Sequence, residues 1–204
     1  MLNKGNIIAF EGIDGCGKTT QCKLFCDYLD KRGIQYQYFS FSENFLDGNM
    51  FDKIKTSSTD EELYYKFKQA MRTYESSKSF FMNYLKYSNH RIIICERYKY
   101  ACNAYLQGQG VKKQIISLLS DWLPAPDLMF YFDIDPATAI ERIRSRGGQL
   151  HWHEREEYLS HILNYLKNEI ECVSANLYTL DAKRNIDFLH MEICNIFMEK
   201  YKKC

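Results

Sequence analysis

The sequence predicts an α/β fold in which a parallel five-stranded sheet lies between two layers of helices, as a three-layer sandwich. Segments of strand length recur along the 204 residues, over residues 7–11, 34–41, 91–96, 128–133 and 177–181. Stretches with helical periodicity separate them, and this alternation is typical of a parallel sheet covered on both faces. No repeat, linker or low-complexity segment interrupts the pattern, so we expect one domain over residues 1–204.

The first predicted strand leads into a motif with defined chemistry. The apolar run over residues 7–10 ends at Glu11 and is followed by Gly12-Ile13-Asp14-Gly15-Cys16-Gly17-Lys18-Thr19, which has the spacing G-x-x-x-x-G-K-[ST]. The glycines let successive backbone N–H groups point into a concave anion site. Lys18 supplies a positive charge to the outer phosphates, and Thr19 offers a hydroxyl to a magnesium ion. The motif predicts nucleotide binding by a P-loop NTPase fold; the alternative is a Gly-rich turn between strand and helix.

The segments between the strands have helical patterns. We predict helices over residues 20–31, 60–85, 98–106, 112–122, 136–146 and 154–173, a terminal helix, and a short helical piece around residues 50–54. In the long helix, Phe67, Tyr74 and Phe81 form an aromatic stripe that we expect to belong to the core rather than to a ligand site. That helix is also a candidate surface for a partner.

Composition and charge exclude several classes of partner. The formal net charge is +1, which provides no basic field for nucleic acid or membrane surfaces. The longest apolar runs have the length of a strand, and the first ten residues lack the apolar core of a signal peptide. The eight cysteines include no C-x-x-C pair, so we expect neither a zinc site nor a disulfide framework. These features predict a cytoplasmic protein.

Polar residues follow the predicted strands, at the edge where parallel sheets bind ligands. They are Glu11, Ser42-Glu43, Glu96-Arg97, Asp133 and Asp181. Glu96 can hold a magnesium-bound water beside Thr19, or act as a base toward a substrate hydroxyl. Arg97 can bind a phosphate through two parallel hydrogen bonds. A structural ion pair at the sheet edge is the alternative.

A basic cluster surrounds a pair of glycines late in the chain. It consists of Arg142, Arg144, Arg146, His151, His153 and Arg155 around Gly147-Gly148. We expect a short lid over about residues 147–155 that closes over the phosphates, excludes water and brings positive charge. Arg142 and Arg146 share one helix face, whereas Arg144 points elsewhere. The alternative is a solvated charged helix.

These residues together resemble the thymidylate kinase family of nucleoside monophosphate kinases over nearly the whole chain. Residues 10–21 are similar to its phosphate loop, Glu96-Arg97-Tyr98 to its Asp-Arg-Tyr, Ala104-Tyr105 to its Ala-Tyr, and residues 126–136 to its Pro-Asp-Leu strand. Ala70-Met71-Arg72 resembles the segment whose arginine reaches the pyrimidine base. The resemblance implies a homodimer that phosphorylates dTMP to dTDP with ATP and Mg²⁺.

The motifs and the resemblance together assign roles to particular residues. The predicted catalytic residues are Lys18, Glu96, Arg97, Arg146 and Arg155, and the predicted metal-binding residues are Thr19 and Glu96. The donor nucleotide is assigned to Gly12, Ile13, Asp14, Gly15, Cys16, Gly17, Lys18, Thr19, Thr20, Arg142 and Ala182. The acceptor dTMP is assigned to Asp14, Glu43, Phe67, Arg72, Arg97 and Tyr105.

The sequence departs from the family pattern at several positions. Glu96 replaces the usual aspartate, and a Glu-Arg pair is also found in deoxynucleoside kinases, where the glutamate takes a proton from the sugar 5′-hydroxyl. Lys68 stands where an aromatic residue is expected, and only Glu43 of Ser42-Glu43-Asn44 matches. Gly15 occupies the loop position at which some members carry arginine, so the charge is expected from the lid. Two alternatives remain: a kinase of another nucleoside or nucleoside monophosphate, and a non-catalytic nucleotide-binding regulator.

Overall fold

The computed structural model describes residues 6–41, 60–87, 92–147, 155–171, 173 and 176–201. The predicted helical piece at residues 50–54, the predicted contact Glu43 and residues 148–154 of the predicted lid lie outside this part of the chain. His151 and His153 belong to that last segment.

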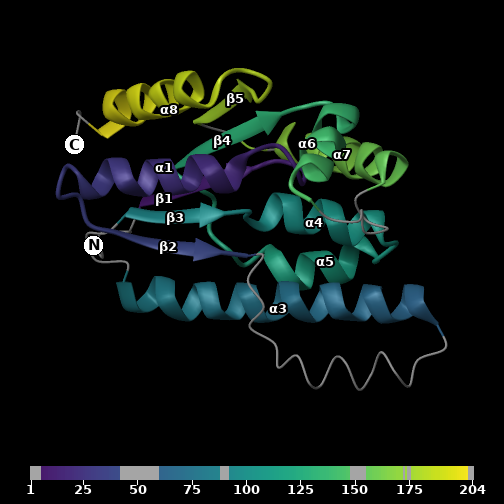
Figure 1. Ribbon diagram of the computed structural model, residues 1–204. Helices are drawn as coiled ribbons and strands as arrows, with labels where there is room; N and C mark the ends of the chain where they lie inside the picture. Colours follow the sequence, from purple (N-terminus) through teal and green to yellow (C-terminus); the bar gives the residue numbers. More distant parts are fainter. Residues whose placement is uncertain are drawn as a thin grey trace.

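Five strands form one parallel sheet in the order β2-β3-β1-β4-β5 (Figure 1). Their bounds are β1 Asn6–Glu11, β2 Tyr36–Ser40, β3 Ile92–Glu96, β4 Leu128–Asp133 and β5 Leu177–Asp181. The register pairs Phe10 of β1 with Glu96 of β3 on one side and with Phe130 of β4 on the other. The predicted α/β class and the five-stranded parallel sheet are confirmed.

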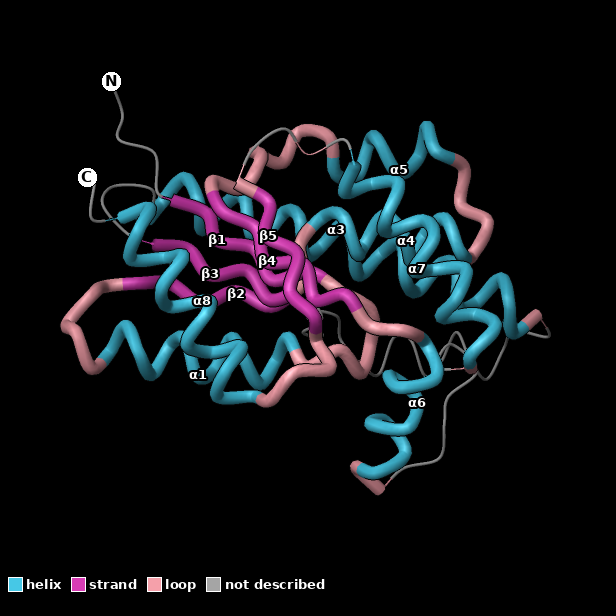
Figure 2. Tube along the Cα trace, turned by 90° about the horizontal axis from the view of Figure 1, so that it is seen from above, coloured by secondary structure: helices cyan, strands magenta, loops and turns pink. Residues whose placement is uncertain are grey.

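Helices cover both faces of the sheet (Figure 2). Their bounds are α1 Lys18–Asp30, α3 Glu61–Tyr87, α4 Lys99–Gly108, α5 Lys113–Ser120, α6 Pro136–Ser145, α7 Glu156–Glu171 and α8 Ile186–Tyr201. Helices α1 and α8 pack together on one face, where the Phe25 and Phe197 ring centroids lie 5.1 Å apart. Helices α3, α4 and α7 cover the other face, with α5 against α3 and α4. Helix α6 lies beyond the carboxyl ends of the strands. Among these described helices, none is long and apolar enough to cross a membrane.

The core explains why the strand patterns are continuous runs rather than alternations. Ile93, Ile94 and Cys95 are buried because helices cover the central strands on both sides. Beside the end of β2, the rings of Phe41, Phe80 and Tyr98 pack with centroids 5.2–5.6 Å apart. This aromatic cluster ties the end of β2 and the middle of α3 to the residue that precedes α4.

The expectation that the aromatic stripe of α3 is core is wrong for two of its three members. Phe67 is 43% exposed and Tyr74 is 44% exposed, while Phe81 packs edge-on against Trp122. The side of α3 that faces the protein carries small polar residues as well as apolar ones, including buried Thr73, Ser76 and Ser77. Aromatic spacing therefore indicated an amphipathic helix correctly but assigned the wrong side of it to the core.

Candidate active site

The loop between β1 and α1 is shaped by glycines in conformations that other residues avoid. Gly15 has φ 84° and Gly17, the N-cap of α1, has φ 96°. A Cβ added to Gly15 would lie 2.4 Å from the backbone oxygen of Ala139 in α6. No side chain fits there without moving the α6 backbone, so this loop position cannot carry a basic group. The loop instead presents the amino end of a 13-residue helix, which attracts anions.

Lys18 is held over this loop although it carries a full charge. Its side chain is almost entirely buried, and its Nζ donates a hydrogen bond to the Ile13 carbonyl at 3.2 Å. The same Nζ lies 3.6 Å from a carboxylate oxygen of Asp14. These two partners fix the ammonium group at the amino end of α1, where it can reach a phosphate bound by the loop.

Asp14 is the centre of a group of polar side chains from three elements. Its carboxylate accepts a hydrogen bond from Tyr105 Oη at 2.8 Å and forms an ion pair with the Arg97 guanidinium. The Asp14 N–H donates to the same Tyr105 hydroxyl at 3.2 Å. The Arg97 guanidinium lies 4.5 Å from the centre of the Tyr105 ring, within cation–π range. Asp14 therefore links the phosphate loop to the residue after β3 and to α4.

The backbone of Arg97 is itself unusual. Its φ is 56°, a left-handed conformation that non-glycine residues rarely adopt, and its N–H donates to the Phe10 carbonyl at 3.0 Å. Such local strain persists where the surrounding structure imposes it, and it is frequent at functional sites. Here it accompanies an abrupt exit of the chain from β3 and a side chain that reaches Asp14. Burial lowers and the Asp14 carboxylate raises the pKa of Arg97, and the net direction is upward, so the guanidinium stays charged.

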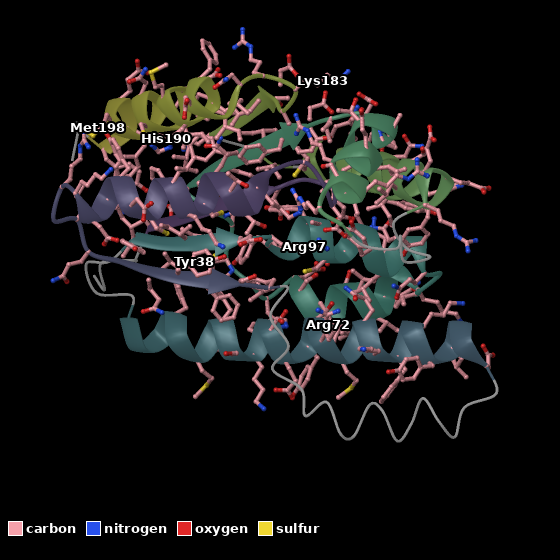
Figure 3. The ribbon with its side chains drawn as sticks, in the orientation of Figure 1. Tyr38, Arg72, Arg97, Lys183, His190 and Met198 are labelled. Atoms are coloured by element: carbon pink, nitrogen blue, oxygen red, sulfur yellow. The ribbon has the colours of Figure 1, made fainter. Side chains whose placement is uncertain are left out.

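Arg72 of α3 lies on the same side of the molecule as Arg97 (Figure 3). Burial, followed by the positive charge of Arg97, lowers its pKa. The Asp14 carboxylate attracts both guanidinium groups, and an anionic ligand close to both would further reduce the repulsion between their charges. Phe67, five positions earlier, is rotated by about 140° around the helix and is 43% exposed, so the described structure does not place it beside Arg72.

Each carboxylate oxygen of Glu96 accepts a hydrogen bond from a side-chain hydroxyl. Thr19 donates to Oε1 from the first turn of α1, and Tyr38 donates to Oε2 from β2. Burial, and then the Glu96 carboxylate, raise the pKa of Tyr38, so its phenol remains a donor. A groove of about 780 Å³ opens beside them; it is lined by Thr19, Lys23, Cys26, Asp27, Tyr36, Tyr38, Ser40 and Glu96.

The donor atoms of this pair fit a magnesium ion. Magnesium prefers oxygen ligands and is bound in phosphate-transfer sites by one or two protein side chains together with substrate phosphates and waters. Thr19 and Glu96 offer such oxygens next to the phosphate loop. No group of three or more His, Cys, Asp or Glu side chains suited to a metal occurs among the described residues. A magnesium ion held by Thr19 and Glu96 would take its other ligands from nucleotide phosphates and water.

Arg142 of α6 and Ala182, which follows β5, are in contact. An Arg142 terminal nitrogen donates to the Ala182 carbonyl at 2.8 Å, and the Ala182 N–H donates to the Asp133 carbonyl at 3.0 Å. This brings α6 against the loop that follows β5. Arg146 and Arg155 are exposed and stand at the two borders of residues 148–154. The lid over about residues 147–155 stays a prediction, since residues 148–154 lie outside the described part of the chain.

Glu11 is a further buried carboxylate that sequence reasoning placed only as a polar residue at a strand end. It is completely buried, and its Oε1 accepts from the backbone N–H groups of Tyr98 at 3.1 Å and Ala101 at 3.4 Å. Its Oε2 has no hydrogen-bond partner among the described residues. Burial raises the pKa of Glu11 to about 7, against partial compensation by those backbone donors and Arg97.

This raised pKa leads to a prediction about stability. In the folded protein Glu11 keeps a proton that the unfolded chain loses, so Glu11 reduces stability progressively as pH rises from about 4.5 to about 7. Glu11→Gln removes this titration but keeps an oxygen acceptor for the two N–H groups. The unfolding free energy of the variant minus that of the unmodified chain should increase by about 2 to 3 kcal/mol from pH 5 to pH 8. Urea unfolding of both proteins at the two pH values measures this; a difference independent of pH would refute it.

Sequence reasoning missed Tyr38 entirely. Its hydroxyl reaches a residue 58 positions away, and only the parallel register of β2 on β3 brings the two together. The sequence shows an aromatic residue in an alternating strand and gives no sign of which face of the sheet it occupies. The missing information was the pairing of the strands.

The strand order, the phosphate loop after the central strand and the Glu-Arg pair after its neighbour define a P-loop nucleotide-binding α/β protein. Comparison with known proteins narrows the class. The family model described as thymidylate kinase matches residues 10–193. The chain belongs to the thymidylate kinase family, as the sequence motifs predict, and this makes it a nucleoside monophosphate kinase, a phosphotransferase.

Individual relatives in this family are similar to the chain over most of their length. The chain is 29% identical to the thymidylate kinase of Fervidobacterium nodosum over 198 residues, covering 93% of this chain and 97% of that one. It is 30% identical to a probable thymidylate kinase of Sulfolobus acidocaldarius, covering 93% and 95%. A probable thymidylate kinase of Methanococcus maripaludis is 34% identical over 153 residues, covering 73% and 69%.

Proposed function

We propose that the protein transfers the γ-phosphoryl group of ATP to dTMP, giving ADP and dTDP, with Mg²⁺ as the accompanying cation. A phosphate oxygen of dTMP attacks the γ-phosphorus, and the bond to the β,γ-bridging oxygen breaks. The observation that carries this proposal is the Asp14–Arg97 ion pair, because it joins a cation suited to an acceptor phosphate directly to the loop that binds the donor. The thymidylate kinase names of the relatives support the choice of acceptor.

The donor side uses the loop and the helix behind it. The backbone N–H groups of residues 12–20 and the Lys18 ammonium bind the β- and γ-phosphates, and α1 adds its positive end. Thr19 and Glu96, the latter through water, would hold Mg²⁺, which when bound neutralises charge on these phosphates. Arg142 and Ala182, already in contact, would lie against the adenine.

The acceptor side uses the group around Asp14. Arg97 binds the dTMP phosphate, and Asp14 and Tyr105 hold its guanidinium in place while they face the sugar. Arg72 reaches the base, and Phe67 is retained only as a predicted contact that requires α3 or its neighbours to move. Glu43 remains a prediction from the resemblance. Positioning and charge stabilisation account for catalysis, since little covalent work falls to the protein.

The lid completes this account. Because the α6 backbone leaves no room for a side chain at Gly15, the loop itself cannot add a basic group for the transferring phosphoryl group. Arg146 and Arg155, which border the lid segment, would add this positive charge. We assign the whole chain to one cytoplasmic kinase domain with this lid over about residues 147–155. Closure would exclude water, which otherwise competes with dTMP for the phosphoryl group.

A coupled ADP-release assay tests the acceptor. The protein is supplied with ATP, Mg²⁺ and, separately, thymidine, dTMP, dUMP, dCMP, dGMP or UMP. We expect a clear preference for dTMP. Turnover of thymidine but not of dTMP would replace the proposal by a nucleoside kinase, and ATP binding without turnover of any acceptor would replace it by a regulator.

We further propose that the protein is a homodimer formed through the outward side of α3. This side exposes Leu63, Phe67, Tyr74 and Met82, with exposed fractions of 61%, 43%, 44% and 63%. Nearby α5 exposes Leu118, and Trp122 after it is partly exposed. Apolar side chains gathered on one side of a long helix are typical of an interface.

Tyr74→Glu should dissociate this dimer because it places an unpaired carboxylate in the contact. A buried unpaired charge costs about 3 kcal/mol or more, which weakens the dimer on the order of 100-fold. Size-exclusion chromatography with light scattering should give twice the chain mass of 24.3 kDa for the unmodified protein and 24.3 kDa for the variant. Met191→Glu on α8, where Met191 is 57% exposed, is the matched control and should remain dimeric. Equal masses for Tyr74→Glu and the unmodified chain would exclude this interface.

A further inference from the structure

Tyr38 occupies a place in the site that neither the phosphate loop nor the Glu-Arg pair explains. Its hydroxyl donates to Glu96 Oε2, while Thr19 donates to Oε1. The two oxygens of one carboxylate are thus held from two elements, α1 and β2. Figure 3 shows Tyr38 on β2.

The strand register explains why a tyrosine serves at this position. Tyr38 pairs with Ile94, two residues before Glu96, and Ser40 is the direct neighbour of Glu96. Two residues of strand span roughly 6.6 Å, so only a long side chain at position 38 reaches the carboxylate. The phenol is the group that combines this length with a hydrogen-bond donor and few rotatable bonds.

Glu96 is a side chain that needs such a partner. A glutamate has one more rotatable bond than an aspartate, and its carboxylate samples more positions unless hydrogen bonds restrict it. With Thr19 alone, one oxygen would be fixed and the other left to rotate. Tyr38 fixes the second oxygen and leaves lone pairs on both for metal-bound waters.

The groove beside Glu96 keeps this arrangement accessible. Thr19, Tyr38 and Glu96 all line it, so a hydrated cation reaches the carboxylate without opening the core. Tyr36 lines the same groove from the same strand, but its hydroxyl donates to Asp30 at 3.0 Å instead. The two tyrosines thus differ in their partner while they share strand, ring and exposure to the groove.

We propose that Tyr38 is a positioning residue that orients the Glu96 carboxylate toward the cation bound with the nucleotide. This inference rests on the proposed metal role of Thr19 and Glu96. Partners that orient a metal-binding carboxylate commonly contribute a factor of 10 to 100 in metal affinity. Tyr38 touches neither nucleotide nor phosphate in this role, so its loss should leave dTMP recognition intact.

The test compares Tyr38→Phe with Tyr36→Phe. Mn²⁺ replaces Mg²⁺, and its affinity for the full-length protein saturated with a non-hydrolysable ATP analogue is measured by electron paramagnetic resonance of the free ion. We expect Tyr38→Phe to weaken Mn²⁺ binding roughly tenfold or more. In steady-state assays the Mg²⁺ concentration for half-maximal rate should rise by a similar factor, with KM for dTMP within about twofold. Tyr36→Phe should leave all three quantities within about twofold.

Combined variants separate positioning from a general loss of structure. In a cycle of Tyr38→Phe with Glu96→Gln, positioning through Glu96 makes the effects on Mn²⁺ affinity non-additive, whereas independent effects or partial unfolding make them additive. Unchanged Mn²⁺ affinity in Tyr38→Phe, with a clear loss in Glu96→Gln, would overturn the role of Tyr38 alone. Unchanged affinity in Glu96→Gln and in Thr19→Ala would overturn the proposed metal site and this inference with it.

Discussion

Arg97→Ala should lower kcat/KM for dTMP by on the order of 10²–10³, the effect of losing a key electrostatic donor to a reacting group. Arg97 is buried, charged and held by Asp14 and the Tyr105 ring, so its guanidinium is preorganised before the acceptor binds. Removal leaves the acceptor phosphate without its bidentate partner. Steady-state kinetics with dTMP varied at saturating ATP measures the loss.

The effect should be confined to the acceptor. Lys18 and the loop remain, so the affinity for a fluorescent ATP analogue should stay within about threefold of the unmodified protein. Arg97→Lys keeps the positive charge but loses the two parallel N–H donors of the guanidinium, so it should recover only part of the rate. Arg32→Ala, which removes an exposed arginine stacked on Tyr28 in the α1 region, is the control and should have normal kinetics. Near-normal turnover by Arg97→Ala would contradict the assigned role.

Because a buried ion pair is involved, stability must be followed in the same variant. After Arg97→Ala, Asp14 still has the Lys18 ammonium at 3.6 Å. Breaking a buried pair commonly costs about 3 to 5 kcal/mol, although Asp14 is partly exposed here and the cost should be smaller. Circular dichroism and a thermal unfolding curve show whether the kinetic loss is measured on folded protein.

Lys18→Ala should produce a loss of similar size on the donor side, on the order of 10²–10³ in kcat. The ammonium is fixed by the Ile13 carbonyl and Asp14 at the amino end of α1, where the β- and γ-phosphates are expected. Charge moves onto the leaving oxygen during transfer, so this interaction strengthens in the transition state and its loss falls mainly on kcat. Quench-flow measurement of product formation with both substrates saturating reports this step.

The matched control is Lys31→Ala, which removes an exposed lysine just beyond the end of the same helix. It should leave kcat unchanged. A Lys18→Ala variant with normal kcat and a raised KM for ATP alone would show that Lys18 contributes only to ground-state binding.

The loop between β1 and α1 could be located from the sequence because its motif is contiguous. Eight neighbouring residues carry the glycine turn, the Lys18 charge and the Thr19 hydroxyl, and the predicted strand and helix on either side were sufficient context. The helix begins at Lys18 rather than at the predicted residue 20, a difference of the size expected for helix ends.

The Glu96-Arg97 pair could be located but not oriented. A strand-end rule places both residues at the ligand edge of a parallel sheet, and they are there. It does not say that Arg97 turns toward Asp14, 83 positions away, or that Glu96 meets Tyr38. Those contacts depend on strand order and register, which the residue pattern of a single sequence does not specify.

The α3 helix shows where periodicity fails. Its aromatic residues lie on more than one side: Phe80 is buried, whereas Phe67 and Tyr74 are exposed. Burial of Thr73, Ser76 and Ser77 needs close packing that their small side chains allow, and no hydrophobicity pattern shows this. The same residues explain why an apolar surface is left for the proposed partner copy.

The transfer itself is tested most directly by following the label from [γ-³²P]ATP in a reaction with dTMP and Mg²⁺. Separation of the products by thin-layer chromatography should show the label at the position of a dTDP standard, with little label in inorganic phosphate. Label released only as inorganic phosphate, or transferred to thymidine but never to dTMP, would contradict phosphorylation of dTMP by this site.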